Sequence, residues 1–94
     1  MDTINESESL AKYAKALSHP TRLAILKHLE NQSCCYTADL VEIFPLAQST
    51  ISQHLKELKN AGLIQGELNP PKIKYCINLT HWQQAQVLFQ QFFS

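Results

Sequence analysis

Hydrophobic residues recur at helical spacing in the middle of the chain, between Leu46 and Ile64. Ile51, Leu55 and Leu58 fall at positions i, i+4 and i+7, so they line one side of a helix. Gly62 follows the last turn, at a position where a left-handed cap favours a residue without a Cβ atom. The pattern therefore predicts an amphipathic helix that ends just before Gly62.

The opposite side of this predicted helix is polar and almost free of negative charge. Its residues are Gln48, Ser49, Thr50, Ser52, Gln53, His54 and Lys56. Side chains of these types bond phosphate oxygens and the edges of bases in a DNA major groove. A helix face that only meets solvent has a similar composition, so the chemistry alone leaves both interpretations open.

Two helical patterns come earlier in the chain. The spacing of apolar residues predicts a first helix over residues 7–17, and the acidic segment 1–6 before it is expected to fray. Pro20 suits the first turn of a second helix over residues 20–30. Apolar residues are nearly continuous over 23–26, so this second helix is expected to be buried on most sides.

A short third helix precedes the polar one. Residues 34–36 fit a short extended segment, and Thr37 is a good N-cap for a helix over residues 38–44. Pro45 ends that helix, and about three residues lead into the polar helix. Two helices joined by so short a turn form a helix-turn-helix arrangement.

The last third of the chain predicts a β-hairpin and a final helix. Residues 63–68 and 72–79 read as two strands, joined by a turn at 69–71 that holds two prolines. Thr80 is expected to cap a last helix over residues 82–93. The fold class is therefore mainly α with a small hairpin, a winged helix-turn-helix in one domain spanning residues 1–94.

The hairpin adds candidate DNA contacts. Lys72 and Lys74 lie at the start of its second strand, from which they are expected to reach the adjacent DNA backbone or minor groove. Because one such helix reads few base pairs, specific binding of double-stranded DNA calls for two copies with helices about 34 Å apart. A homodimer is therefore expected.

Composition limits the other function classes. Ninety-four residues with zero formal net charge and 45% hydrophobic residues suggest one small domain with a modest core. No signal peptide or membrane-length apolar run is visible, and three cysteines are an odd count, so a cytoplasmic protein is expected. No glycine-rich phosphate loop, paired carboxylates or Ser-His-Asp arrangement is evident, which argues against an enzyme.

Four segments together resemble the ArsR-type (arsenic-repressor, SmtB-like) winged-helix transcriptional regulators. They are Leu17-Ser18-His19-Pro20-Thr21-Arg22-Leu23-Ala24-Ile25-Leu26, Ala47-Gln48-Ser49-Thr50-Ile51-Ser52-Gln53-His54-Leu55-Lys56-Glu57-Leu58, Ala61-Gly62-Leu63-Ile64 and Tyr75-Cys76-Ile77-Asn78. The resemblance implies a homodimer joined through its first and last helices, operator binding, and repression relieved by a chemical signal. Ala47 departs from the family, which usually has a capping serine there.

The dimer interface is expected on the apolar sides of the first and last helices. Aromatic residues crowd the last helix and would leave a large exposed patch on a single small domain. The candidate interface residues are Leu10, Tyr13, Trp82, Leu88, Phe89 and Phe92.

The family's common metal sites are not matched. Where many members have a Cys-x-Cys-Asp-Leu motif, this chain has Tyr36-Thr37-Ala38-Asp39-Leu40, so both cysteine ligands are missing. The family's other common site uses Asp and His pairs along the last helix. Here that helix holds only His81, and its other polar positions are glutamines, which are poor zinc ligands.

The candidate signal-sensing residues are Cys34, Cys35 and Cys76. In a winged helix the segment before the third helix commonly pairs with the second strand of the wing, which would bring these cysteines close. Side chains alternate across a strand, so only one of Cys34 and Cys35 can face Cys76 unless the segment bends. Three thiolates could bind trivalent arsenic or another thiophilic ion, two thiols could form a regulatory disulfide, and all three could be packing residues.

The sequence thus predicts an operator-binding homodimeric repressor released by a thiol-reactive signal: a metalloid, a metal or an oxidant. Two alternatives stay open. One is a winged-helix regulator whose cysteines are structural and which has no small-molecule inducer. The other is a winged helix used for protein–protein contact.

Overall fold

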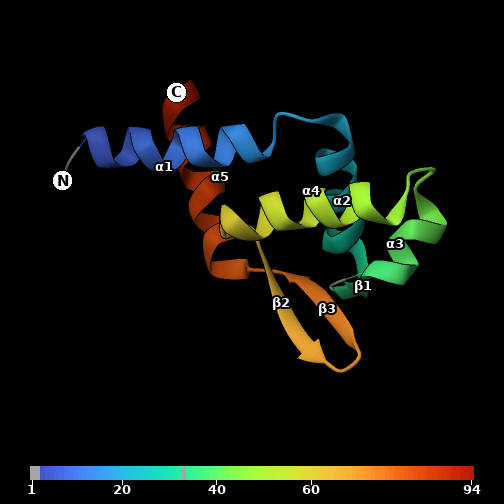
Figure 1. Ribbon diagram of the computed structural model, residues 1–94. Coiled ribbons are helices and arrows are strands. Elements are labelled where there is room, and N and C mark those ends of the chain that lie inside the picture. Colours follow the sequence, from blue (N-terminus) through green and yellow to red (C-terminus); the bar gives the residue numbers. More distant parts are fainter. Residues whose placement is uncertain (1–2, 33) are drawn as a thin grey trace.

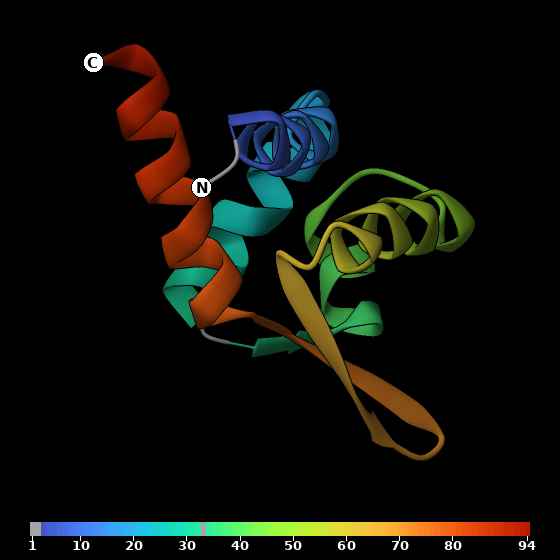
Figure 2. The same cartoon turned by 90° about the vertical axis from the view of Figure 1, so that its left-hand side faces the viewer.

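The computed structural model describes residues 3–32 and 34–94, and its elements follow the predicted order (Figure 1). They are α1 (Thr3–Ala16), α2 (Pro20–Gln32), β1 (Cys34–Tyr36), α3 (Thr37–Ile43), α4 (Gln48–Asn60), β2 (Ile64–Asn69), β3 (Lys72–Ile77) and α5 (Leu79–Phe93). The fold is mainly helical with one small sheet, as predicted. The β2–β3 hairpin extends away from the helices as a wing (Figure 2).

The sheet joins two segments that are far apart in the sequence. Its strand order is β1-β3-β2, and both pairings are antiparallel. The return strand of the wing, β3, therefore lies in the centre and pairs with the short strand that leads into α3. This pairing sets Cys34 opposite Cys76 and Tyr36 opposite Lys74.

The hydrophobic core lies beneath α4. Its stripe of Ile51, Leu55 and Leu58 is fully buried, as predicted. Leu26 of α2 and Leu40 of α3 belong to the same buried cluster, so α2 and α3 pack against the apolar side of α4. The wider prediction that α2 is buried on most sides is wrong. Ile25, Leu26 and Leu29 form one buried stripe, and Leu23, which lies off this stripe, is 46% exposed.

Several predicted boundaries are wrong by a few residues. α1 continues back to Thr3 where fraying was expected over 1–6; no Gly or Pro interrupts it there, and Glu6 in the first turn suits the helix dipole. Residues 1 and 2 of that predicted segment lie outside the described residues. α2 runs on to Gln32.

The N-caps of α3 and α5 also differ from the prediction. Tyr36, one residue before Thr37, is the cap residue of α3, and its backbone N–H donates to Oδ2 of Asp39 over 3.3 Å. Asn78 rather than Thr80 caps α5, because its Oδ1 accepts from the backbone N–H of His81 over 3.3 Å. A capping side chain two residues earlier in the chain thus adds a turn to α5.

Gly62 ends α4 in the left-handed conformation that the sequence predicts. Its φ is 87°, and its N–H donates to the carbonyl of Lys59 over 2.9 Å while Leu63 donates to Leu58 over 3.1 Å. These two bonds form a Schellman cap. The Gly62 carbonyl lies 3.0 Å from Nδ1 of His81, which ties the end of α4 to the start of α5.

His54 faces the core and not the outer side of α4. Its side chain is 8% exposed, and its ring centroid lies 4.4 Å from that of His19. Among the described residues, no group bonds its buried Nδ1. Burial lowers the pKa of His54, and the nearby His19 and Arg22 lower it further. Arg22 itself donates from Nε to the Ala16 carbonyl over 2.7 Å, at the end of α1.

We predict that Gly62→Ala lowers the free energy of unfolding by about 1–3 kcal/mol, because the side chain would need a left-handed backbone. A Cβ atom at this position would also overlap Nδ1 of His81 and lie 2.9 Å from its Cε1. Urea denaturation measures the loss. Gly66→Ala is the control, since its nearest contacts would be 3.3 Å away. Equal losses in the two variants would contradict this account of the cap.

We predict that the unfolding free energy falls as the pH drops below about 6.5, the ordinary pKa of histidine. The pKa of His54 in the folded state is below that value, so the unfolded chain binds a proton at this site more readily as the pH falls. Protonation therefore stabilises the unfolded state relative to the folded state. Above about pH 6.5 neither state is protonated at this site, and the effect vanishes.

Thermal denaturation across this range measures the slope, and His54→Gln is expected to flatten it. His28→Gln is the control, because His28 lies half-buried on α2, outside the core cluster. A slope that survives His54→Gln unchanged would assign the titration to another group.

Candidate nucleic-acid interface

The outer face of α4 is polar and accessible. Ile51, Leu55 and Leu58 fix the helix to the core together with the buried His54, and the opposite side of the helix points outward. Those that are exposed and were predicted to contact DNA are Gln48, Ser49, Thr50, Ser52, Gln53 and Lys56. Glu57 is the acidic residue of α4, and its Oε1 accepts from Nε2 of Gln53 over 3.4 Å. The face can therefore offer amide, hydroxyl and ammonium groups to an acidic partner.

The start of α4 has no capping side chain. Ala47 occupies the N-cap position with extended backbone and no side-chain hydrogen bond to the first turn. The first backbone N–H groups of α4 thus face outward without a side-chain acceptor, at the positive end of the helix dipole. Such a helix start suits a phosphate oxygen.

The predicted contact by His54 is not supported by the structure. Its ring lies under α4 beside His19, so it is not part of the polar face. Residues 51, 54, 55 and 58 recur at i, i+3, i+4 and i+7, which puts His54 on the buried stripe of the helix. We leave His54 out of the interface.

The wing and α4 border one cleft. Gln48 and Ser52 line it from α4, Lys72 lines it from β3, and Tyr36 lines it at the end of β1; its volume is about 410 Å³. The structure thus brings together α4 and the start of β3, which the sequence predicted separately as DNA contacts. Tyr36 was not predicted to be part of this site, although its place directly before α3 could have indicated it.

The two lysines of the wing differ. Lys72 is exposed, with Nζ 5.3 Å from the ring centroid of Tyr36. Lys74 is half-buried, and its Nζ lies 3.4 Å from Oε2 of Glu67, the residue directly opposite on β2. The ion pair offsets the charge of Lys74, so Lys72 is the stronger candidate for a phosphate contact.

Two of the three cysteines meet. Cys34 and Cys76 form a disulfide across β1 and β3, with Cα atoms 4.2 Å apart. Cys35 is a free thiol on the other face of β1, buried in the core. Burial raises its pKa, and the Asp39 carboxylate raises it further. The alternation of side chains along β1 thus separates Cys35 from the other two sulfurs.

This arrangement does not form the three-thiolate site that was one of the alternatives. Within residues 3–32 and 34–94, no group of three or more His, Cys, Asp or Glu side chains is placed to hold a metal ion. The disulfide is the state of the pair in this structure.

The candidate interface residues on α1 and α5 divide into two groups. Tyr13 is 1% exposed, and its hydroxyl donates to Oε1 of Gln84 over 3.2 Å, so it joins α1 to α5 within one subunit. Its predicted place in a dimer interface is therefore wrong. Leu10, Trp82, Leu88 and Phe89 are half-buried, whereas Phe92 is 66% exposed.

No helix within the described parts of the chain is long and apolar enough to span a membrane.

The sequence matches relatives of one kind. A family model described as "bacterial regulatory protein, arsR family" matches residues 19–65, which include α2, α3 and α4. The HTH-type transcriptional regulator YgaV of Escherichia coli is 37% identical over 71 residues, which are 76% of this chain and 72% of YgaV. The HTH-type transcriptional repressor SmtB of Mycobacterium tuberculosis is 36% identical over 69 residues, covering 72% of this chain and 50% of SmtB.

The fold has close counterparts among solved structures. A possible transcriptional regulator for arsenical resistance superposes with a TM-score of 0.78 at 28% identity, covering 85% of this chain and 82% of that one. The family model, the relatives and the shared fold agree with each other and with the exposed polar helix. The chain belongs to the ArsR family of winged helix-turn-helix transcriptional regulators, and it is not an enzyme.

Proposed function

We propose that this protein is a cytoplasmic homodimeric repressor that binds double-stranded operator DNA, and that the oxidation state of Cys34 and Cys76 controls the binding. The observation that carries the proposal is the cleft shared by α4 and the wing. It sets Gln48 and Ser52 of the polar helix face beside Lys72 of β3. One surface thus offers groups that can read base edges next to a group that can bind phosphate.

The proposed docking follows from the shape of this surface. α4 would enter the major groove with its uncapped start toward a phosphate, and Gln53 and Ser52 would meet base edges. Lys72 would contact the backbone beside that groove. Because the chain has no net positive charge, these local contacts must supply the attraction that a basic protein gets from its surface as a whole.

The proposed dimer covers apolar side chains that one subunit leaves outside. Val87, Phe92 and Phe93 on α5 are 49%, 66% and 78% exposed. Phe92 also lines a groove of about 290 Å³ with Leu10 of α1 and Leu88 of α5. A second copy packed here would bury this surface and present two α4 helices to successive turns of DNA.

The proposed signal acts where the wing joins the rest of the subunit, at the pairing of β3 with β1. β1 is three residues long and leads directly into α3, while β3 carries the wing. The disulfide links these two strands, so reduction removes the covalent tie between the wing and the helix-turn-helix. The reduced pair would also be a dithiol for trivalent arsenic or another thiophilic ion, which is the second candidate signal.

We predict that Gln53→Ala and Ser52→Ala each reduce discrimination between specific and scrambled duplexes by about 1–3 kcal/mol, if each side chain contacts a base edge. The specific duplexes are those that the wild-type protein selects from a random library, and fluorescence anisotropy measures both affinities. Gln32→Ala, an exposed glutamine at the end of α2, is the matched control. Unchanged discrimination in both variants would refute the proposed reading face.

We predict that Phe92→Glu dissociates the dimer and weakens operator binding, because it buries a charge in the proposed interface. The subunit should still fold, since this side chain is largely exposed. Sedimentation velocity measures the oligomeric state, and Gln90→Glu on the same helix is the control. An intact dimer in the Phe92→Glu variant would rule out this face of α5.

A further inference from the structure

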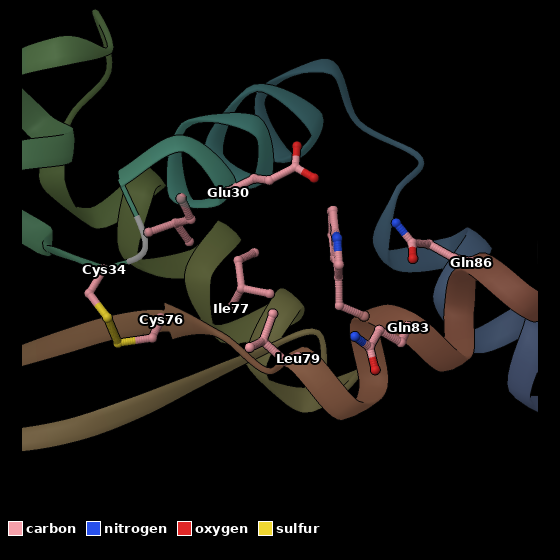
Figure 3. A pocket seen from close by; sticks show the side chains of 9 residues that line it. Glu30, Cys34, Cys76, Ile77, Leu79, Gln83 and Gln86 are labelled. Carbon is pink, nitrogen blue, oxygen red and sulfur yellow. A yellow bond between two sulfur atoms is a disulfide. The ribbon is translucent and has the colours of Figure 1, made fainter.

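A second cleft lies at the opposite end of the β1–β3 pair from the cleft that we propose for DNA, and the Cys34–Cys76 disulfide forms part of its wall. Cys34 and Cys76 line it together with residues of α2 and α5, and its volume is about 460 Å³ (Figure 3). That volume suits a small molecule. The cleft is distinct from the surface that we propose for DNA, and none of the contacts described above fills it.

The walls of this cleft are mainly apolar. Leu29, Ile77, Leu79 and Trp82 supply its hydrocarbon and aromatic surface. Figure 3 shows Ile77 and Leu79 between the disulfide at one end and Gln83 at the other. Leu79 is 65% exposed although it is a large apolar residue at the start of α5. A ligand with an apolar body would cover it.

The polar groups of the cleft lie toward its rim on the helices. Gln83 and Gln86 of α5 and Glu30 of α2 complete the lining (Figure 3). Lys27 pairs with Glu30 over 2.8 Å but is not among the lining residues. Within the described part of the chain, then, no cationic side chain lines the cleft, so a ligand carboxylate would find no ionic partner there.

The two cysteine residues of the disulfide differ in exposure. Cys34 is half-buried, whereas Cys76 is 7% exposed. A thiolate that attacks a disulfide must reach one of its sulfur atoms. An incoming molecule in the cleft therefore meets Cys34 first, and Cys76 is the group that leaves.

We propose that this cleft binds a low-molecular-weight thiol with an apolar body and no carboxylate, and that the bound thiol exchanges with the Cys34–Cys76 disulfide. The thiolate of the ligand attacks Sγ of Cys34, forming a mixed disulfide with that residue. The Cys34–Cys76 bond breaks, Cys76 leaves as a thiolate, and it takes from solvent the proton that the ligand thiol gave up. β1 then keeps its backbone pairing with β3 but loses the covalent link to it.

The inference deepens the proposed function, on which its consequence for DNA binding rests. The binding and exchange steps stand on the cleft and the disulfide alone. The test therefore measures exchange, occupancy of the cleft and DNA binding separately.

The exchange arm compares 2-phenylethanethiol with glutathione on the oxidised protein. Each rate is divided by the rate of the same thiol with hydroxyethyl disulfide, which removes differences in intrinsic reactivity. Phenylethanethiol should show a normalised rate at least about tenfold higher, and acid-quenched mass spectrometry should place the first adduct on Cys34. Equal normalised rates, or a first adduct on Cys76, would overturn the proposal.

A variant changes the selectivity without touching the sulfurs. Gln83→Lys adds a cation to the cleft and should raise the normalised rate of glutathione severalfold. Gln90→Lys adds the same charge to an exposed position of α5 that does not line the cleft, and it should leave the rate unchanged. The same response from both variants would show that general surface charge, and not the cleft, sets the selectivity.

The occupancy arm uses 2-phenylethanol, which has the same apolar body and no thiol. Trp82 is the single tryptophan of the chain and lines the cleft, so its fluorescence reports binding directly. A saturable change in emission that Leu79→Gln weakens would support the site. A strictly linear response, unchanged in Leu79→Gln, would overturn it.

The last arm follows DNA binding during exchange. Selective exchange with altered affinity for the selected duplex would support both the site and the proposed redox control. Selective exchange with unaltered affinity would uphold the site and refute the control of DNA binding by the disulfide.

Discussion

The antiparallel pairing of β1 with β3 is the constraint on which the rest of the molecule depends. β1 has three residues and leads without a break into α3, and β3 is the central strand that holds the wing. Because α3 packs against α4, the pairing fixes the polar helix and the wing relative to each other. Without it, Lys72 would not border the same cleft as Gln48 and Ser52.

α4 meets two demands with its two sides. Its buried stripe of Ile51, Leu55 and Leu58 is worth about 1.5–3 kcal/mol per side chain, enough to hold a helix whose other face makes few contacts within the subunit. The residues of that outer face are then not constrained by packing, and their types can suit a binding partner. The missing capping side chain at Ala47 fits this division, since the open helix start costs stability but stays free for an acidic partner.

The sequence predicted the order of the elements because two signals agree throughout most of the chain: the spacing of apolar residues, and the glycines and prolines that end helices and strands. The helical stripe of α4, Gly62 and the prolines between the strands all point to the same fold. It failed where one residue satisfies two patterns. His54 has the side chain of a DNA contact but the position of a core residue, and the position decided. Where the two disagree here, the position of a residue in the helical repeat, and not its chemical type, decides whether it is buried.

Other errors arise because the periodicity of the sequence shows that one side of a helix is apolar but does not show which element, of the same subunit or of another, packs against it. Tyr13 lies on the apolar side of α1, and that side packs on α5 of the same subunit, where the hydroxyl finds Gln84. The two cysteines of β1 show the same ambiguity. Alternation allowed only one of them to face Cys76, and the three-dimensional packing, in which Cys35 fills the core, gives that role to Cys34.

The two clefts share strand β3, and this gives the proposed control a physical route. Lys72 lies at one end of the strand and Cys76 near the other, about 13 Å away at 3.3 Å per residue. Tyr36, opposite Lys74, belongs to the cleft that we propose for DNA and to the strand that the disulfide ties. Among the described residues three pairs join β1 to β3, so a covalent bond at one of them is a large part of what holds the strands together. In the proposed control, a change at Cys34 would therefore act on the edge of the proposed DNA surface through backbone pairing, without any change in the residues that would touch DNA.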